Sequence, residues 1–466
     1  MTDLVVSDAE VDGRRVDLHV SGGRIVEVVA AGCRAPAADL VVDAGGGGVI
    51  PGLHDHHIHL MALAAARTSV PAGPPAVRTG TELVAALRAA DAALPAGAWI
   101  RATGYHESVA GAIDGRWLDA AVPGRPVRVQ HRSGAAWILN GVAASAVGLA
   151  RAGTPGAECD ERGRPTGRLF GADEWLRRRV PAVAVDLDAV GGELASYGVT
   201  AVTDATPIEE AADADLLAAA TDGFPVRAVV TGAPGLPVAA ASGRERGPVK
   251  LVAADHALPA IDELVAGIAA ARRQARAVAV HCVTREALLL TLAAFEEAGT
   301  APGDRIEHAA VVPVESIGRL RELGLTVVTQ PGFVAERGDQ YLSDVDPADR
   351  PDLWRCGTLL AAGVPVGAGT DAPFGSPDPW AAVAAAVERR TETGSVLGAA
   401  ERLPAAAALD LFLAPLAWPG GARRRIEVGA PADLCVLDAP LARVLSAPSR
   451  SSVAVTVAGG RVTFRR

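Results

Sequence analysis

The chain has 466 residues, half of them hydrophobic, and carries a formal net charge of −10 at pH 7. This length suits about two or three ordinary domains, or one large barrel with additions. The acidic balance argues against nucleic acid or an anionic membrane surface as a partner, so we expect a small-molecule partner. The sequence leaves the formation of a homo-oligomer open.

The N-terminus and the cysteines indicate the compartment. Residues 1–20 are acidic and alternate polar with apolar side chains, unlike a secretory signal. No apolar run reaches the roughly 20 residues that a membrane span needs. The five cysteines are widely spaced and form no CxxC pair, which favours reduced thiols over a disulfide framework. We therefore expect a cytoplasmic protein.

Both ends of the chain predict short strands. Residues 3–50 alternate polar and apolar positions between glycine pairs, which is typical of β-hairpins. The stretches PADLCVLD, SVAVTVAGG and RVTFRR return to this pattern near the C-terminus. We expect residues 1–50 and 425–466 to form one composite β-sandwich, with residues 51–424 as a barrel domain between them.

The middle of the chain alternates strand and helix patterns. A first strand is predicted at 48–53, and seven further β-branched runs predict strands at 198–205, 227–234, 248–255, 277–282, 304–309, 326–332 and 365–372. Helical patterns follow most of them, at 207–222, 260–275, 285–299, 312–324, 350–363 and 378–391. Eight such units predict an α/β fold, a distorted (β/α)8 barrel of the TIM type.

One long insertion interrupts this alternation. Residues 61–183 separate the first barrel strand from the second, whereas such connections usually take about 2–6 residues. The insertion contains a helical pattern at 81–94 and the strand-like pieces WIRATGYHES and RPVRVQHRSG. We expect a subdomain that lies over the active site at the mouth of the barrel and selects the substrate.

Lys250 is the only lysine among 44 basic residues, and all the others are arginine. A lysine amine can lose its proton and react as a nucleophile, whereas a guanidinium in practice cannot. A lysine retained by drift is the plain alternative. Lys250 lies in the strand-like run PVKLVAAD, and other polar residues stand near the ends of neighbouring predicted strands. This position favours a chemical function for Lys250 over drift.

Metal-ligand side chains stand at the ends of several predicted strands. His57 and His59 are two residues apart, so both point to the same side of a strand. His281, His308 and Asp371 follow at the ends of later strands. Nitrogen and carboxylate ligands suit zinc, and they also accept iron, manganese or cobalt. His281 or His308 alone is better explained as a hydrogen-bonded core residue, but a set of five polar groups buried without partners would be costly.

The order HxH, Lys, His, His, Asp on successive strands resembles the amidohydrolase superfamily of metal-dependent hydrolases. The blocks PGLHDHHIH, GVTAVTD, RIEHA, TQPGF and GTDAPFGSPDP are similar to its YtcJ-like, N-substituted formamide deformylase-like branch, the amidohydrolase 3 type, and the resemblance covers nearly the whole chain. It implies one or two divalent ions, zinc foremost, held by His57, His59, Lys250, His281, His308 and Asp371. It also implies that CO2 carboxylates Lys250, whose carbamate would bridge two ions.

The reaction implied by this resemblance is hydrolysis of a non-peptide C–N bond, in an amide or formamide-like group, by a metal-bound hydroxide. Asp371 would act as general base and then as general acid. One metal or a nearby histidine would polarise the carbonyl, and the predicted catalytic residues are Asp371, Lys250 and His308. A mononuclear deaminase of the same barrel, which would not need Lys250, and a non-catalytic, metal-stabilised regulator are the alternatives.

The chain departs from the family pattern where we expect the substrate. HRSGAAWILN lacks the histidine of the family's DGH-type triplet, GYHES replaces a Gly-Trp pair, and AADHALP replaces a glycine-containing loop. These differences argue against carrying over the formamide activity itself. The predicted substrate-contacting residues are Tyr105, His106, His131, Arg132, Trp137, His256 and Gln330.

Overall fold

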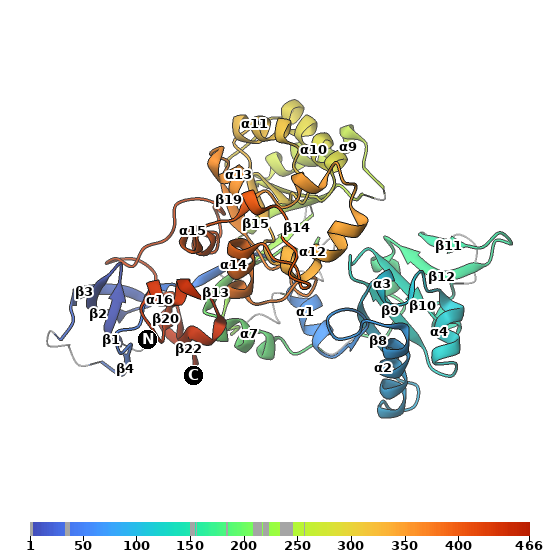
Figure 1. The fold of residues 1–466 in the computed structure, drawn as a ribbon, viewed down its shortest axis with the longest axis horizontal. Coiled ribbons are helices and arrows are strands. Elements are labelled where there is room, and N and C mark those ends of the chain that lie inside the picture. The colour runs from blue at the N-terminus through green and yellow to red at the C-terminus, as the bar shows by residue number, and fades with distance from the viewer. Residues whose placement is uncertain are drawn as a thin grey trace. The chain divides into compact units, whose positions relative to one another are not determined.

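The structure is a computed structural model, and it describes residues 3–32, 38–149, 154, 156–182, 185–207, 217, 223–233, 246–255 and 257–466. The chain divides into two compact units, which are shown in Figure 1. Unit 1 comprises Met1–Leu60 and Leu187–Arg466, and unit 2 comprises Met61–Asp186. In the part of the chain that is described, no helix is both long and apolar enough to cross a membrane.

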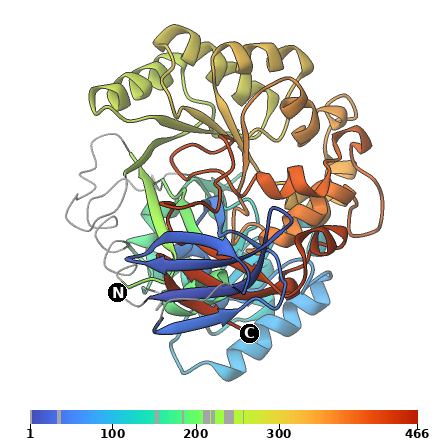
Figure 2. The same ribbon diagram turned by 90° about the vertical axis from the view of Figure 1, so that its left-hand side faces the viewer.

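Two four-stranded sheets come from the ends of the chain, with the strand orders β3-β2-β1-β4 and β22-β21-β20-β5. Their strands are β1 (Leu4–Val11), β2 (Arg14–Ser21), β3 (Arg24–Ala30), β4 (Leu40–Asp43), β5 (Val49–Pro51), β20 (Leu434–Leu437), β21 (Val453–Ala458) and β22 (Arg461–Arg465). Figure 2 shows the blue and red strands side by side, and one hydrophobic cluster joins Leu18 and Val42 with Leu434 and Val457. The predicted terminal strands are therefore present, while their arrangement as one sandwich domain stays a prediction.

An eight-stranded parallel sheet forms the centre of unit 1, in the order β19-β18-β17-β16-β15-β14-β13-β6. Its strands are β6 (Leu53–Ile58), β13 (Val199–Asp204), β14 (Arg227–Gly232), β15 (Arg246–Val252), β16 (Val278–Cys282), β17 (Arg305–His308), β18 (Thr326–Thr329) and β19 (Val366–Ala368). The two outer strands meet just beyond β19, because the Asp371 amide donates to the His57 carbonyl at 2.7 Å and the His59 amide to that of Ala372 at 2.9 Å. The sheet is thus a nearly closed barrel, which confirms the predicted α/β barrel.

The first barrel strand differs from its prediction. The predicted strand at 48–53 is wrong, because β5 pairs with β20 in a terminal sheet and β6 carries the HDHHI motif. Two apolar runs follow each other here without a polar residue between them, so the sequence pattern predicts one strand where the structure has two. Gly52 separates them, and a Cβ at this position would lie 2.2 Å from Cγ2 of Thr200.

Helices follow most barrel strands. They are α9 (Ile261–Arg273), α10 (Arg285–Ala298), α11 (Val314–Glu322), α12 (Gly332–Asp344), η2 (Arg350–Asp352), α13 (Cys356–Ala361) and α14 (Pro379–Glu388). The other described helices of unit 1 are α7 (Leu187–Ser196), which precedes β13, and η3 (Ala399–Glu401), α15 (Ala405–Asp410), α16 (Leu441–Ser446) and η4 (Arg450–Ser452) after the barrel strands. The predicted helix at 207–222 lies almost entirely outside the described residues. The single helix predicted at 350–363 is wrong, because Trp354 adopts a left-handed conformation (φ 52°) between η2 and α13.

Sequence periodicity did not predict α12. Gly338 interrupts its helical pattern, and glycine lowers helix propensity. The structure explains this glycine, since a Cβ there would lie 2.5 Å from Cγ2 of Thr391. Close packing against Thr391 therefore requires a glycine at position 338, and this glycine weakens the helical pattern in the sequence.

Unit 2 is built on a six-stranded sheet in the order β11-β12-β10-β9-β8-β7. Its elements, with α1 at the junction, are α1 (Leu60–Arg67), β7 (Val70–Pro71), α2 (Gly80–Ala93), β8 (Ile100–Tyr105), α3 (Glu107–Ala110), α4 (Gly115–Ala121), β9 (Val127–His131), β10 (Ala136–Leu139), α5 (Gly141–Val147), β11 (Ala157–Cys159), β12 (Pro165–Phe170) and α6 (Asp173–Arg177). A capping box between Thr79 and Glu82 starts α2, and a cluster with Leu83 and Ile100 forms a hydrophobic core. The unit thus has its own core, while its position over the active site stays a prediction.

Closure of the barrel predicts the effect of one glycine substitution. A Cβ at Gly369 would lie 2.5 Å from both N and Cβ of His57. We expect Gly369→Ala to lower stability by about 1–3 kcal/mol, because buried atoms would be overpacked. The thermal unfolding midpoint (Tm) measures this effect.

Gly318→Ala is the matched control. It lies in α11 and a Cβ there would meet no atom within 4 Å, so we expect unchanged or slightly higher stability. Equal Tm values for Gly369→Ala and the wild type would contradict the close approach of Gly369 to His57.

Candidate metal centre

The predicted ligands gather near the carboxyl ends of the barrel strands. His57 lies in β6 with His59 directly after it, Lys250 in β15, His281 in β16, His308 at the end of β17, and Asp371 beyond β19. Parallel strands place these ends at one rim of the barrel. The topology therefore brings residues that are far apart in the sequence to one place.

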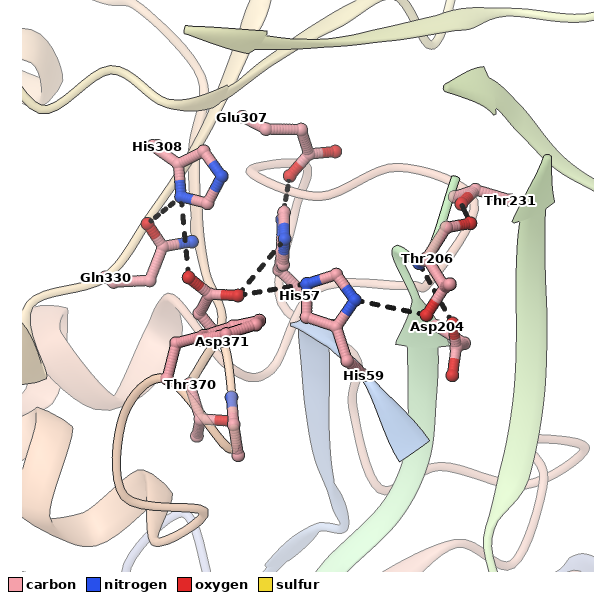
Figure 3. Close-up of polar contacts among 12 residues, drawn as sticks. His57, His59, Asp204, Thr206, Thr231, Glu307, His308, Gln330, Thr370 and Asp371 are labelled. Carbon is pink, nitrogen blue, oxygen red and sulfur yellow. Dashed lines mark hydrogen bonds and ion pairs between the residues drawn. The ribbon is translucent and has the colours of Figure 1, made fainter. Parts of the chain in front are cut away.

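Four imidazole rings and one carboxylate form a contiguous group. Neighbouring ring centroids are 5.3 Å apart for His59 and His57, 4.7 Å for His57 and His308, and 4.5 Å for His308 and His281. Figure 3 shows the Asp371 carboxylate between three of these rings. Its Oδ1 lies 3.1 Å from His59 Nε2 and 3.5 Å from His57 Nε2, and its Oδ2 lies 3.8 Å from His308 Nδ1.

Hydrogen bonds fix which ring nitrogens carry protons. His57 Nδ1 donates to Glu307 Oε2 at 2.5 Å, and His308 Nδ1 donates to Gln330 Oε1 at 2.9 Å. The neutral rings therefore present an Nε2 lone pair. His57 Nε2 and Asp371 Oδ1 are buried without a hydrogen-bond partner among the described residues. Two lone pairs that face each other in this way fit a cation between them.

Burial keeps these imidazoles neutral. It lowers the pKa of His57 and His308 well below the usual value and that of His281 to about 3. Desolvation is the main cause, and the positive charge of Lys250 adds to it for all three rings. A neutral imidazole is the form that ligates a metal ion.

Asp55 joins the two ligand-bearing segments. Its Oδ1 accepts hydrogen bonds from the amides of His57 at 3.1 Å and Thr370 at 3.0 Å, and its Oδ2 accepts one from Thr370 Oγ1 at 2.5 Å. The carboxyl group is fully buried, which raises its pKa to about 7. Asp55 thereby sets the spacing between His57 and Asp371.

Ligand-bearing backbone is held in left-handed conformations. His308 (φ 68°), its neighbour Ala309 (φ 48°) and Asp371 (φ 55°) all lie in this region. Side chains rarely adopt it, and such residues cluster at functional sites. Here the conformation lets Glu307 and His308, which are adjacent in β17, both reach the ligand group.

Lys250 has the environment of a reactive amine. It exposes 6% of its surface, and its Nζ has no hydrogen-bond partner in the described part of the chain. Burial lowers its pKa, and the charge of Arg305 adds to this effect, whereas Glu307 and Asp371 act in the opposite direction. The neutral amine, which alone reacts with CO2, is favoured by this burial.

Glu307 and Arg305 support the centre but were not predicted from the sequence. Both are buried, and Arg305 Nε donates to Glu307 Oε1 at 2.6 Å while the other carboxylate oxygen accepts from His57. The motif RIEHA contained the signal, because its glutamate directly precedes His308. Strict alternation of side chains along β17 would place Glu307 on the opposite face from His308, away from the site.

Aromatic residues lie beside the ligands. Phe374 contacts the His59 ring at a centroid distance of 5.4 Å and packs with Phe333, Tyr341 and Trp354 in one cluster. The low aromatic content of the sequence gave no indication of this grouping. An apolar wall of this kind favours a substrate with an apolar part.

The predicted substrate contacts lie in different surroundings. Gln330 is 1% exposed and holds His308, and His256 lies outside the described residues. In unit 2, Tyr105 is a core residue with 1% exposure, and its hydroxyl donates to the Gly111 carbonyl. A side chain packed in this way offers a ligand almost no surface.

Three further predicted contacts lie near one another in unit 2. His106 and His131 surround Glu107, with His131 Nε2 at 3.1 Å from Glu107 Oε2 and His106 Nε2 at 3.9 Å. Arg132 follows His131, and its amide donates to the Tyr105 carbonyl. One ligand atom from each of His106, Glu107 and His131 lies within 4.8 Å of the others, as a metal site requires.

The protonation of this second group argues against a metal ion. His106 Nδ1 accepts from the Ser108 amide, and His131 Nδ1 accepts from the Ser133 amide. A neutral ring whose Nδ1 accepts carries its proton on Nε2, the atom that faces Glu107. This is the opposite of the arrangement at His57 and His308, so the barrel group fits a cation better. Trp137, the remaining predicted contact, donates to Asp173 in the same unit at 2.7 Å.

The fold is similar to solved structures of hydrolases. An uncharacterized metal-dependent hydrolase from Pyrococcus horikoshii OT3 matches with a TM-score of 0.71 and 20% identity, over 94% of this chain and 97% of that chain. A second, from Pyrococcus furiosus, matches with a TM-score of 0.68 and 21% identity, over 94% of this chain and 99% of that chain. These likenesses establish the fold.

A family model identifies the family, and two sequence relatives agree with it. The N-substituted formamide deformylase of Arthrobacter pascens is 27% identical, over 94% of each chain. The putative amidohydrolase YtcJ of Bacillus subtilis strain 168 is 27% identical over 42% of this chain and 39% of its own length. A model described as the amidohydrolase family matches residues 40–464. The motif-based assignment is thus confirmed, and this chain belongs to the amidohydrolase family, as a hydrolase that acts on carbon–nitrogen bonds.

Proposed function

We propose that the chain hydrolyses a non-peptide C–N bond, in an amide or formamide-like group of a small molecule, with the help of a divalent cation. The observation that carries this proposal is the convergence of buried lone pairs at His57 Nε2 and Asp371 Oδ1, without a proton between them. The name of the Arthrobacter relative supports a formyl or acyl amine as the substrate class. The aromatic wall at Phe374 supports an apolar substituent on that amine.

The cation, for which we propose zinc, would be held by His57, His59 and Asp371. Bound there, it would supply a water molecule of lowered pKa and polarise the carbonyl oxygen of the substrate. His281, His308 and a carboxylated Lys250 are the proposed ligands of a second ion. The carbamate forms when the neutral Nζ of Lys250 bonds to the carbon of CO2 and releases one proton.

Asp371 would move the proton of the reaction. Its Oδ2, the carboxylate oxygen that is not proposed to hold the cation, would take a proton from the attacking water and then pass it to the nitrogen of the leaving amine as the C–N bond breaks. Asp371 suits this transfer because a hydrogen bond from its amide to the His57 carbonyl, at 2.7 Å, fixes its backbone. The Nδ1 of His308 lies 3.8 Å from Oδ2 and is held by Gln330, so His308 would contribute to the reaction by holding the second ion through its Nε2.

Glu307 would act as a positioning residue. Its hydrogen bond fixes the tautomer and the ring orientation of His57, and Arg305 holds the carboxylate in place. Partners of this kind raise the basicity of a metal-binding histidine. Glu307 therefore affects the reaction through His57 without touching the substrate.

Loss of the proton carrier should strongly reduce turnover. We expect Asp371→Asn to lower kcat by about 10²–10⁴-fold, because an amide cannot accept the proton of water. Hydrolysis of a panel of N-formyl and N-acetyl amines measures this effect. Asp262→Asn, at an exposed position in α9, is the control and should react like the wild type. An Asp371→Asn enzyme with normal kcat would contradict the proposed proton transfer.

The carbamate can be observed directly, because Lys250 is the only lysine of the chain. With 13C-bicarbonate and metal, we expect a 13C carbamate signal in the wild type that is absent in Lys250→Arg. The N-terminal amine is the one other aliphatic amine, and any signal from it persists in the variant. Metal analysis should show fewer ions per chain in Lys250→Arg.

Two results would count against the bridging lysine. One is an identical 13C spectrum for the wild type and Lys250→Arg. The other is a Lys250→Ala enzyme with full activity and one metal ion per chain, which would favour a mononuclear enzyme of the same barrel.

The position of Glu307 predicts a change in metal affinity. We expect Glu307→Gln to weaken metal binding by about 10–100-fold, because His57 loses a charged acceptor. Competition with a chelator measures the affinity. Glu315→Gln, at an exposed site in α11, is the control. A Glu307→Gln protein with a lower Tm and unchanged metal affinity would assign this residue to folding alone.

A further inference from the structure

Two arginines lie side by side in the sheet of unit 2. Strands β8 and β9 run parallel, and their register pairs Arg101 with Arg128. The guanidinium carbons of both residues lie over the ring of Trp137, at 5.5 Å and 5.2 Å from its centroid. Like charges on neighbouring strands repel, so this pair destabilises the sheet unless an anion compensates it.

The side chains near Arg101 provide little negative charge. Arg101 donates to Ser69 Oγ at 2.5 Å and to Gln130 Oε1 at 3.4 Å, and both acceptors are neutral. Asp173 is the acidic group that acts on Arg101, but its Oδ1 accepts from Trp137 Nε1 at 2.7 Å. The single negative charge of the Asp173 carboxylate therefore compensates at most one of the two guanidinium charges.

Arg128 is the less compensated of the two arginines. It exposes 8% of its surface, and its buried Nε has no acceptor among the described residues. In that same set of residues, the side chain of Arg128 contacts the Trp137 ring and forms no hydrogen bond or ion pair. Burial lowers the pKa of Arg101 and Arg128 to about 10, so both remain charged at neutral pH. A buried cation without a partner is costly to keep.

We propose that Arg101 and Arg128 bind the carboxylate group of a small molecule beside Trp137. The planar guanidinium matches the two oxygens of a carboxylate, and such bonds are strong because both partners are charged. Two such groups on adjacent strands can bind one carboxylate together. This site lies wholly within unit 2 and does not depend on the proposed hydrolysis.

The stability of the full-length protein tests this site. We expect sodium acetate to raise the Tm of the wild type at constant ionic strength, because a ligand of the native state stabilises it. Acetamide, which has nearly the same shape and no charge, should leave the Tm unchanged. Equal shifts with acetate and acetamide would overturn the proposal.

Two variants of Arg128 sharpen the test. Arg128→Gln should weaken acetate binding at least about tenfold, whereas Arg162→Gln, at an exposed position in the same unit, should respond like the wild type. Arg128→Met should have a higher Tm than the wild type in acetate-free buffer, since it removes an unpaired buried charge. An Arg128→Gln protein with the full acetate response, or a less stable Arg128→Met protein, would overturn the site.

The origin of the carboxylate is a separate arm of the experiment. If the substrate supplies it, Arg128→Gln raises KM for a carboxylated substrate at least about tenfold and leaves KM for the matching carboxamide unchanged. If a separate small molecule supplies it, neither KM changes while acetate binding is lost. The unfolding measurements need no turnover, so a failure of the proposed hydrolysis would leave them intact.

Discussion

The architecture of the barrel rim depends on one electrostatic constraint, the approach of unprotonated ligand atoms in a buried place. Asp371 Oδ1 lies 3.5 Å from His57 Nε2 and 3.1 Å from His59 Nε2. The contact with His57 brings two lone pairs together, because the proton of His57 is on Nδ1, and it is repulsive unless a cation lies between them. The surrounding structure maintains this arrangement. Glu307 fixes the tautomer of His57, Asp55 ties His57 to the backbone before Asp371, and a left-handed backbone aims the carboxylate.

Unit 2 meets a comparable constraint in another way. At the rim of the barrel, lone pairs converge and favour a cation, whereas beside Trp137 two guanidinium groups converge and favour an anion. In both places a buried charged or polar group has no partner within the described residues. A ligand at either place would compensate these groups.

The barrel and the convergence of the candidate ligands could be predicted because they follow simple local rules. Apolar β-branched runs mark buried strands, and a polar residue at the end of each run marks the rim, which found His281 and His308. The features that could not be predicted depend on irregular backbone or on packing between different elements. Glu307 reaches the site through a break in strand alternation, and Gly52 separates two strands that read as one. Tyr105 was predicted as a substrate contact from the motif GYHES, yet its ring lies in a core that also contains Leu83 and Val129 from other elements of unit 2.

The central claim is that a cation lies among His57, His59 and Asp371. A crystal structure at the zinc absorption edge, from protein supplied with zinc and bicarbonate, tests it most directly. The account predicts an anomalous peak at bonding distance, about 2.0–2.2 Å, from the Nε2 atoms of both histidines and from Asp371 Oδ1. A map without such a peak, in which Asp371 instead forms hydrogen bonds with protonated imidazoles, would contradict it.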